Sequence, residues 1–125
     1  MNENLIYREE AYKIVGICME VHRELGKGFN EVVYSDALEI EFMDHSINYS
    51  REKKYAISYK GNILSHQYKA DFIIEDKIVL EIKAIECLNT AHLKQTLNYL
   101  AVTKLKLGLL INFGEDSLKY KRFVL

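Results

Sequence analysis

Residues 69–84, KADFIIEDKIVLEIKA, contain two apolar segments on either side of the polar triplet 75–77. Short apolar runs that flank a polar turn are typical of a β-hairpin. If the turn comprises all of residues 75–77, counting outward from it places Asp71 opposite Glu81. Because strand side chains alternate between the two faces of a sheet, Lys83 then lies on the same face as Glu81. A two-residue turn shifts the register and breaks this pairing.

The two facing carboxylates indicate a site for a divalent metal ion. In a largely apolar hairpin they are poorly solvated and repel each other, which raises their pKa values and destabilises the strand pair. A hard cation such as Mg²⁺ or Mn²⁺ relieves both effects, because it accepts carboxylate oxygens and retains several waters. Lys83, beside such an ion, is in position to orient an attacking water or to neutralise charge on a phosphoryl oxygen. The alternative is a surface hairpin whose charged face is simply solvated.

The composition describes a single domain with a hydrophobic core. The chain has 125 residues, of which 49% are hydrophobic, and it shows no linker or internal repeat. It also shows no apolar run long enough for a membrane span and no signal-peptide pattern, so no membrane partner is expected. Cys18 and Cys87 lack C-x-x-C spacing. They are expected to be buried free thiols of a cytoplasmic protein.

The net charge of -1, from 17 basic and 18 acidic residues, does not favour strong non-specific binding of nucleic acid by the whole surface. A local basic surface remains open, because lysines and arginines are grouped in two regions. These are Arg51, Lys53 and Lys54, and, nearer the C-terminus, Lys104, Lys106, Lys119, Lys121 and Arg122. Such runs are more often solvated faces than binding patches.

Hydrophobic periodicity predicts a mixed α/β domain with the element order α-α-β-β-β-α-β-β. Helices are expected over residues 7–25, from the N-cap Asn30 to about residue 44, and over 90–104. Strands are expected over 49–60, 63–74, 78–85, 107–113 and 117–125, the last at a sheet edge. The third helix is expected to bury the stripe formed by Leu93, Leu97, Leu100 and Ala101.

Further polar side chains on the predicted helices are candidates for the same site. Glu31 shares a helical stripe with apolar residues, where a carboxylate needs a partner, although the first helical turn also favours negative charge. With a metal at the hairpin, Glu31 becomes a candidate third ligand. His92, Gln95 and Tyr99 lie on one side of the third helix, away from the leucine stripe. They are solvated unless that side faces the hairpin carboxylates.

Several motifs together resemble the GxxExxY protein family, which is assigned to the PD-(D/E)XK nuclease superfamily. The matching segments cover nearly the whole chain. They are Gly28-x-x-Glu31-x-x-Tyr34, Tyr68-Lys69-Ala70-Asp71, Glu81-Ile82-Lys83-Ala84, His92-x-x-Gln95-x-x-x-Tyr99-Leu100 and residues 107–114. Alanine rather than proline precedes Asp71, a departure that the superfamily tolerates, and the charged motif positions are intact.

The resemblance implies a restriction-endonuclease-like fold: a mixed sheet flanked by helices. It further implies a nuclease that uses Mg²⁺ or Mn²⁺ to hydrolyse nucleic acid, DNA rather than RNA. The implied metal ligands are Asp71, Glu81, the carbonyl of Ile82 and Glu31. Lys83 is the implied catalytic lysine, acting with Asp71, Glu81 and Gln95, and the implied substrate contacts are Tyr99, His92 and Tyr34.

Two expectations about assembly and activity accompany this resemblance. A homodimer is expected, because small nucleases that cut duplex DNA usually need two active sites. The alternative to a nuclease is a non-catalytic module that uses the same fold to bind nucleic acid or a protein, because a fold alone does not establish an activity.

Overall fold

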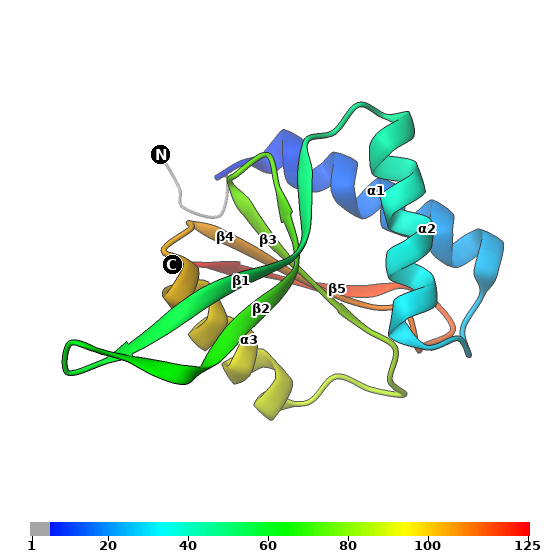
Figure 1. The fold of residues 1–125 in the computed structure, drawn as a ribbon. Helices are drawn as coiled ribbons and strands as arrows, with labels where there is room; N and C mark the ends of the chain where they lie inside the picture. Colours follow the sequence, from blue (N-terminus) through cyan, green and yellow to red (C-terminus); the bar gives the residue numbers. More distant parts are fainter. Residues whose placement is uncertain (1–5) are drawn as a thin grey trace.

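The computed structural model describes residues 6–125 and contains three helices and five strands in that range (Figure 1). The helices are α1 (Arg8–Leu25), α2 (Glu31–Asp44) and α3 (Thr90–Thr103). The strands are β1 (Tyr49–Tyr59), β2 (Asn62–Ile74), β3 (Ile78–Lys83), β4 (Leu107–Asn112) and β5 (Lys119–Val124). The predicted element order is confirmed. Within the described residues, no helix is both long and apolar enough to cross a membrane.

The five strands form one mixed sheet in the order β1-β2-β3-β4-β5. Strands β3 and β4 are parallel and are joined through α3, whereas the other neighbouring pairs are antiparallel. Every residue of β4, and every residue of β3 except Lys83, is buried. Strands buried on both faces read as continuous apolar runs, which is how residues 78–80 of β3 and 107–111 of β4 appear in the sequence.

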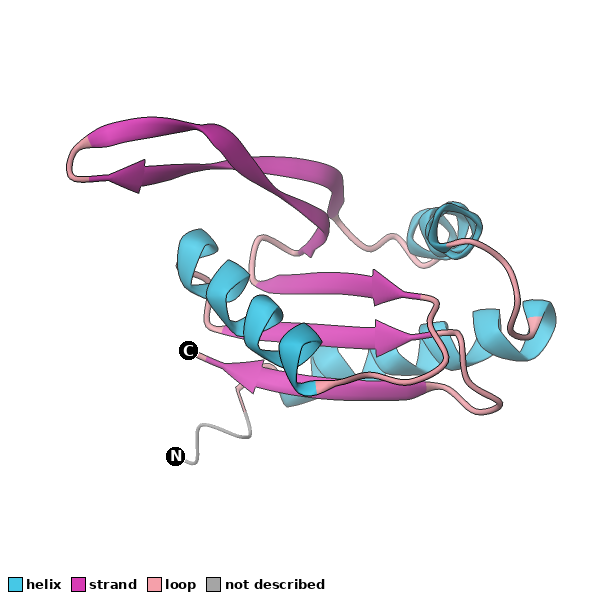
Figure 2. Cartoon of the chain, turned by 90° about the horizontal axis from the view of Figure 1, so that it is seen from below, coloured by secondary structure: helices cyan, strands magenta, loops and turns pink. Residues whose placement is uncertain are grey.

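Helices cover both faces of this sheet, so the domain has three layers (Figure 2). Helices α1 and α2 pack on one face, over a core that includes Ile14, Leu38, Phe72 and Leu80. Helix α3 covers the other face, where Leu100 packs with a smaller cluster around Ile73 and Val79. The site described below lies at the margin of this smaller cluster.

The β2–β3 hairpin has the register that a three-residue turn requires. Ile74 pairs with Ile78, Ile73 with Val79 and Phe72 with Leu80. In the turn, Glu75 and Asp76 both have φ near 55°. The pair Phe72–Leu80 is followed by Asp71 and Glu81, so the turn length on which the carboxylate pairing depends is confirmed.

A break in the β1–β2 pairing lies directly beside this hairpin. Arg51 pairs with Phe72 and Lys53 with Ala70, but Glu52 and Asp71 between them are skipped. Glu52 has a φ of 55°, a left-handed conformation that is uncommon outside glycine. Beyond the break, residues 53–69 form a two-stranded ribbon that projects from the body of the domain (Figures 1 and 2). We call this ribbon the arm.

Two sequence-based expectations were wrong in detail. On α3, Leu97 is 43% exposed and Ala101 is exposed, whereas Thr96, Leu100 and Thr103 form the buried face. Threonine is tolerated there because its hydroxyl bonds to a carbonyl of the preceding turn, as the Thr96 hydroxyl does with His92 at 2.9 Å. Among the cysteines, Cys18 is buried as expected, but Cys87 is exposed in the loop after β3; both thiols are free.

Candidate active site

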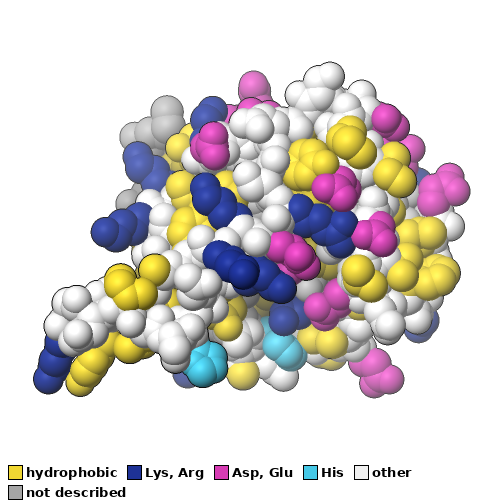
Figure 3. All heavy atoms as spheres, viewed as in Figure 1, with side chains coloured by type: hydrophobic (Ala, Val, Ile, Leu, Met, Phe, Trp, Pro, Cys, Tyr) yellow, Lys and Arg dark blue, Asp and Glu magenta, His cyan; other side chains and the backbone are white. Residues whose placement is uncertain are grey.

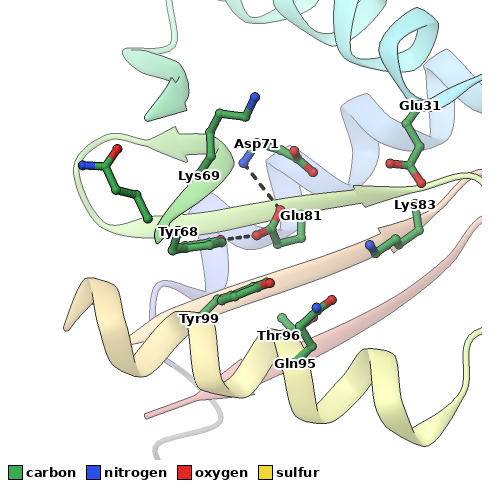
Figure 4. A pocket seen from close by; sticks show the side chains of 10 residues that line it. Glu31, Tyr68, Lys69, Asp71, Glu81, Lys83, Gln95, Thr96 and Tyr99 are labelled. Atoms are coloured by element: carbon green, nitrogen blue, oxygen red, sulfur yellow. Dashed lines mark hydrogen bonds between the residues drawn. The ribbon is translucent and has the colours of Figure 1, made fainter. Parts of the chain in front are cut away.

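Residues from β2, β3, α2 and α3 line a pocket of about 280 Å³ (Figure 4). The buried face of α3 is rotated about the helix axis relative to the predicted leucine stripe. This orientation turns Gln95 and Tyr99 toward the sheet, so that they line this pocket together with the hairpin carboxylates. The lining residues are Glu31, Gln67, Tyr68, Lys69, Asp71, Glu81, Lys83, Gln95, Thr96 and Tyr99. The pocket therefore brings together Glu31, Asp71, Glu81, Lys83, Gln95 and Tyr99, which the sequence had singled out.

The two hairpin carboxylates are held by hydrogen bonds that cross between β2 and β3. Asp71 Oδ2 accepts a hydrogen bond of 2.8 Å from the backbone N–H of Ile82. Glu81 Oε2 accepts a long one of 3.5 Å from the backbone N–H of Asp71, and Oε1 accepts one from the Tyr68 hydroxyl (Figure 4). Each carboxylate thus binds the strand opposite its own, which fixes both groups at the place where the regular strand pairing ends.

The environment of Glu81 disfavours its charge. The side chain is only 8% exposed, and Asp71 lies beside it. Burial, and then the charge of Asp71, raise the pKa of Glu81 to about 8, although the hydrogen bond from Tyr68 acts in the opposite direction. Without a cation, Glu81 is therefore mostly protonated at neutral pH. A bound divalent cation would favour its ionised form.

Tyr68 connects the arm, the carboxylates and α3. Its ring stacks on that of Tyr99, with a centroid distance of 4.0 Å and an interplanar angle of 14°. Burial and the nearby Glu81 charge raise the pKa of the Tyr68 hydroxyl, so it remains a hydrogen-bond donor. Regular alternation along β2 places Tyr68 and Asp71 on opposite faces of the sheet. The break at Asp71 brings them together, and sequence reasoning therefore missed Tyr68.

Lys83 is the last residue of β3, is half-buried and lines the pocket. Its strand partner is Asn112 at the end of β4, which is fully buried. The Asn112 amide donates to the carbonyl of Ile85 at 2.9 Å and accepts from the Ile85 N–H at 3.0 Å. It also accepts from the N–H of Gly114 at 3.1 Å. This side chain therefore closes the loop that follows Lys83 and fixes the end of the strand that presents the lysine.

The donor set fits a hard divalent cation that takes few protein ligands. Asp71 and Glu81 offer carboxylate oxygens, which Mg²⁺ and Mn²⁺ prefer. In an extended strand the N–H and C=O of one residue point to the same side, so the Ile82 carbonyl is directed toward Asp71, as its N–H is. Within residues 6–125, however, no three His, Cys, Asp or Glu side chains form a group that could hold a metal ion. Glu31 therefore lines the pocket without completing a three-carboxylate cluster.

Two of the candidate substrate contacts do not line this pocket. Tyr34 is fully buried, stacks on Phe113 at a centroid distance of 4.5 Å and donates a 2.6 Å hydrogen bond to the carbonyl of Gly26. It holds the α1–α2 loop against the core. His92 caps α3: its Nδ1 accepts from the N–H of Asn89, and its own N–H donates to the Asn89 side chain. Both residues therefore have structural roles.

The other lining residues that the sequence did not single out are Gln67, Lys69 and Thr96. Gln67 and Lys69 belong to the arm, and no periodicity marks them as different from other exposed strand residues. Thr96 is 4% exposed and was missed because the helix was expected to bury leucines instead.

A mixed sheet covered by helices on both faces, with facing carboxylates and a lysine at the end of a central strand, defines a restriction-endonuclease-like domain. The chain belongs to the PD-(D/E)XK nuclease superfamily, whose family model matches residues 8–123. The crystal structure of SSO0001 has a similar fold, with a TM-score of 0.58 and 24% sequence identity over 75% of this chain. The match covers 50% of SSO0001, so the likeness concerns the fold of about half of that protein. No curated protein matches the sequence.

Proposed function

We propose that this chain is a divalent-metal-dependent nuclease that hydrolyses phosphodiester bonds, in DNA rather than in RNA. The observation that supports the proposal most is the convergence of Asp71, Glu81 and Lys83 in one pocket. Membership of the nuclease superfamily supports the reaction class. The segment around Glu31 resembles the GxxExxY signature, and Gln95 with Tyr99 resembles the Q-x-x-x-Y element of RecB-like nucleases, which is why we assign these residues to the same site.

In this proposal Asp71, Glu81 and the Ile82 carbonyl hold Mg²⁺ or Mn²⁺. When bound, the cation supplies a water of lowered pKa and neutralises charge on the phosphoryl group. The Lys83 ammonium holds the attacking water or a phosphoryl oxygen by hydrogen bonding. Gln95 and Tyr99 position the substrate from α3, and the Tyr68 hydroxyl fixes the orientation of Glu81.

Cleavage assays with single-stranded, duplex and branched DNA, and with RNA, test the proposal. We expect DNA cleavage in Mn²⁺ that is abolished by EDTA, by Lys83→Ala and by Asp71→Ala. Lys94→Ala is the matched control, because Lys94 is exposed on α3 outside the set of pocket-lining residues. If the folded wild-type protein cuts none of these substrates, and calorimetry detects no binding of Mn²⁺ or Mg²⁺, the proposal fails.

The second candidate is a non-catalytic module that binds nucleic acid. The lack of a three-carboxylate group in residues 6–125 favours it. It predicts that Asp71→Asn leaves the affinity for DNA unchanged and that no metal-dependent cleavage occurs.

We further propose a homodimer, because cleavage of both strands of a duplex requires two such sites. Light scattering in the presence and absence of duplex DNA tests this. A particle that remains a monomer in both conditions contradicts it.

A further inference from the structure

The arm differs in charge from the rest of the molecule. Residues 53–69 contain four lysines and no acidic residue, whereas the remaining residues carry 13 basic and 18 acidic side chains. In Figure 3, lysine and arginine side chains lie over the base of the arm, with acidic side chains of the neighbouring surface beside them. The pocket carboxylates and the acidic remainder repel a polyanion. The arm is therefore the element next to the pocket whose charge attracts one.

Two lysines lie opposite each other where the arm meets the pocket. Lys54 pairs directly with Lys69 across the two strands, so both side chains lie on one face of the ribbon. Both are exposed, and Lys69 also lines the pocket. Like charges in this arrangement destabilise a strand pair. Among the described residues, these two lysines take part in one ion pair, in which the Lys69 Nζ lies 3.9 Å from a carboxylate oxygen of the exposed Glu52. A bound anion between the lysines relieves their repulsion.

The other face of the arm is engaged with the domain. Tyr55 pairs with Tyr68, and Tyr68 stacks on Tyr99 of α3. The lysine face is therefore held in a fixed orientation relative to the carboxylates. Gln67, which pairs with Ala56, lies on the lysine face and also lines the pocket, and it adds an amide donor next to the lysines.

The arm is long enough to follow a nucleic-acid backbone. Strands rise by about 3.3 Å per residue, so Lys54 lies roughly 20 Å from Lys60 at the tip. The same length of duplex carries about 12 phosphates, since one negative charge occurs per about 1.7 Å of helix axis. Such a ribbon contacts successive phosphates without reading the bases.

We propose that the arm binds the phosphate backbone of nucleic acid. Lys54 and Lys69 on its lysine face hold the phosphates next to the pocket, and Lys60 in the tip turn holds a phosphate further along. The inference rests on the proposed nuclease function and adds the surface that captures the substrate. In this view the arm supplies the affinity for nucleic acid, and the pocket supplies the groups that carry out the proposed hydrolysis.

Fluorescence anisotropy in EDTA tests the proposal without cleavage. The probes are a labelled duplex of about 20 base pairs and a single strand of the same sequence, at several salt concentrations. The test variant is Lys54→Gln/Lys69→Gln. The matched control is Lys13→Gln/Lys121→Gln, which removes the same charge from exposed positions on α1 and on β5, at the opposite sheet edge from β1. Circular dichroism verifies that all variants are folded.

We expect the test variant to lose roughly tenfold to hundredfold in affinity at about 0.1 M salt, and the slope of log K against log salt to fall in magnitude by about 2. Lys60→Gln should reduce that slope by about 1. The control should bind as the wild type does. A stronger effect on the duplex assigns the arm to duplex backbone, and a stronger effect on the single strand assigns it to unpaired backbone. If the test variant binds as tightly as the control, or if the wild type binds neither probe, the proposal is overturned.

Cleavage in Mn²⁺ separates this inference from the proposed function. Binding that depends on the arm, without any cleavage, retains the inference and rejects the nuclease. Cleavage by the wild type with an unchanged kcat/KM in Lys54→Gln/Lys69→Gln retains the nuclease and rejects the arm as the binding surface.

Discussion

Replacing Glu81 by glutamine should stabilise the metal-free protein at high pH. The pKa of Glu81 is raised from 4.5 to about 8 by burial and by the neighbouring Asp71. Between these values the folded state holds a proton that the unfolded state has released, so the free energy of unfolding falls as pH rises through this interval. Above it, the full difference is roughly 3 to 5 kcal/mol, since one pKa unit corresponds to about 1.4 kcal/mol.

Glutamine retains the size of the side chain and an oxygen that accepts from the Tyr68 hydroxyl, and its amide can donate to Asp71. The variant should therefore match the wild type near pH 5 and exceed its stability by roughly 3 to 5 kcal/mol near pH 9. Urea denaturation in EDTA, followed by circular dichroism across this pH range, measures the difference. Glu20→Gln, at an exposed position on α1, should show no such pH-dependent gain.

Divalent metal should stabilise the wild type more than the Glu81→Gln variant. A cation that binds the folded wild type stabilises it by mass action, and the glutamine variant lacks one of the proposed carboxylate ligands. Adding Mn²⁺ near pH 8 should therefore raise the midpoint of the wild type more than that of Glu81→Gln. Parallel pH profiles for the two proteins in EDTA would refute the assignment of Glu81 as a carboxylate that is destabilised by its surroundings.

Three further substitutions test the parts of the fold that position the site, and a fourth, Gly16→Ala, serves as a comparison. Asn112→Ala leaves the backbone groups of Ile85 without their partners and should cost roughly 2 to 4 kcal/mol in urea denaturation; a loss below about 1 kcal/mol contradicts the role of this amide. Gly114→Ala brings a Cβ into the backbone of Ile85 and should lower the free energy of unfolding by roughly 1 to 3 kcal/mol. Gly16→Ala, whose Cβ meets no atom within 4 Å, should instead stabilise α1 by about 0.5 to 1 kcal/mol. Tyr34→Phe removes the hydrogen bond to Gly26 and should cost about 1 to 2 kcal/mol while metal-dependent cleavage is retained; loss of cleavage in the folded variant would return Tyr34 to the site.

The carboxylate pair was predictable because it depends on local rules. A polar triplet between apolar runs set the turn length, and strand alternation then placed Asp71 opposite Glu81. The buried face of α3 was not predictable in the same way. Apolar periodicity assumes that leucine is buried in preference to threonine, but Thr96 and Thr103 satisfy their hydroxyls within the helix. That rotation decides which side chains of α3 enter the pocket.

The contribution of Tyr68 depended on an irregularity that no sequence rule marks. Glu52 adopts a left-handed conformation although it is not glycine, and the alternation of side chains changes there. Residues on the two sides of such a break cannot be assigned to a face by counting. For Tyr34 the motif predicted a substrate contact, whereas the structure places this tyrosine in the packing of a loop, outside the pocket lining.

The skipped pair Glu52–Asp71 also divides the β1–β2 hairpin into two parts, and the length and sequence of one part can change without altering the other. The half next to β3 keeps the register that places Asp71 opposite Glu81, since its pairing with Leu80 does not pass through the arm. The distal half ends in a turn at Lys60 and Gly61, where residues added in pairs, one to each strand, preserve the alternation of its faces. The arm is thus an exchangeable part. Chains with longer or recharged arms should keep the same carboxylate pair, while the proposed binding surface changes in length or charge.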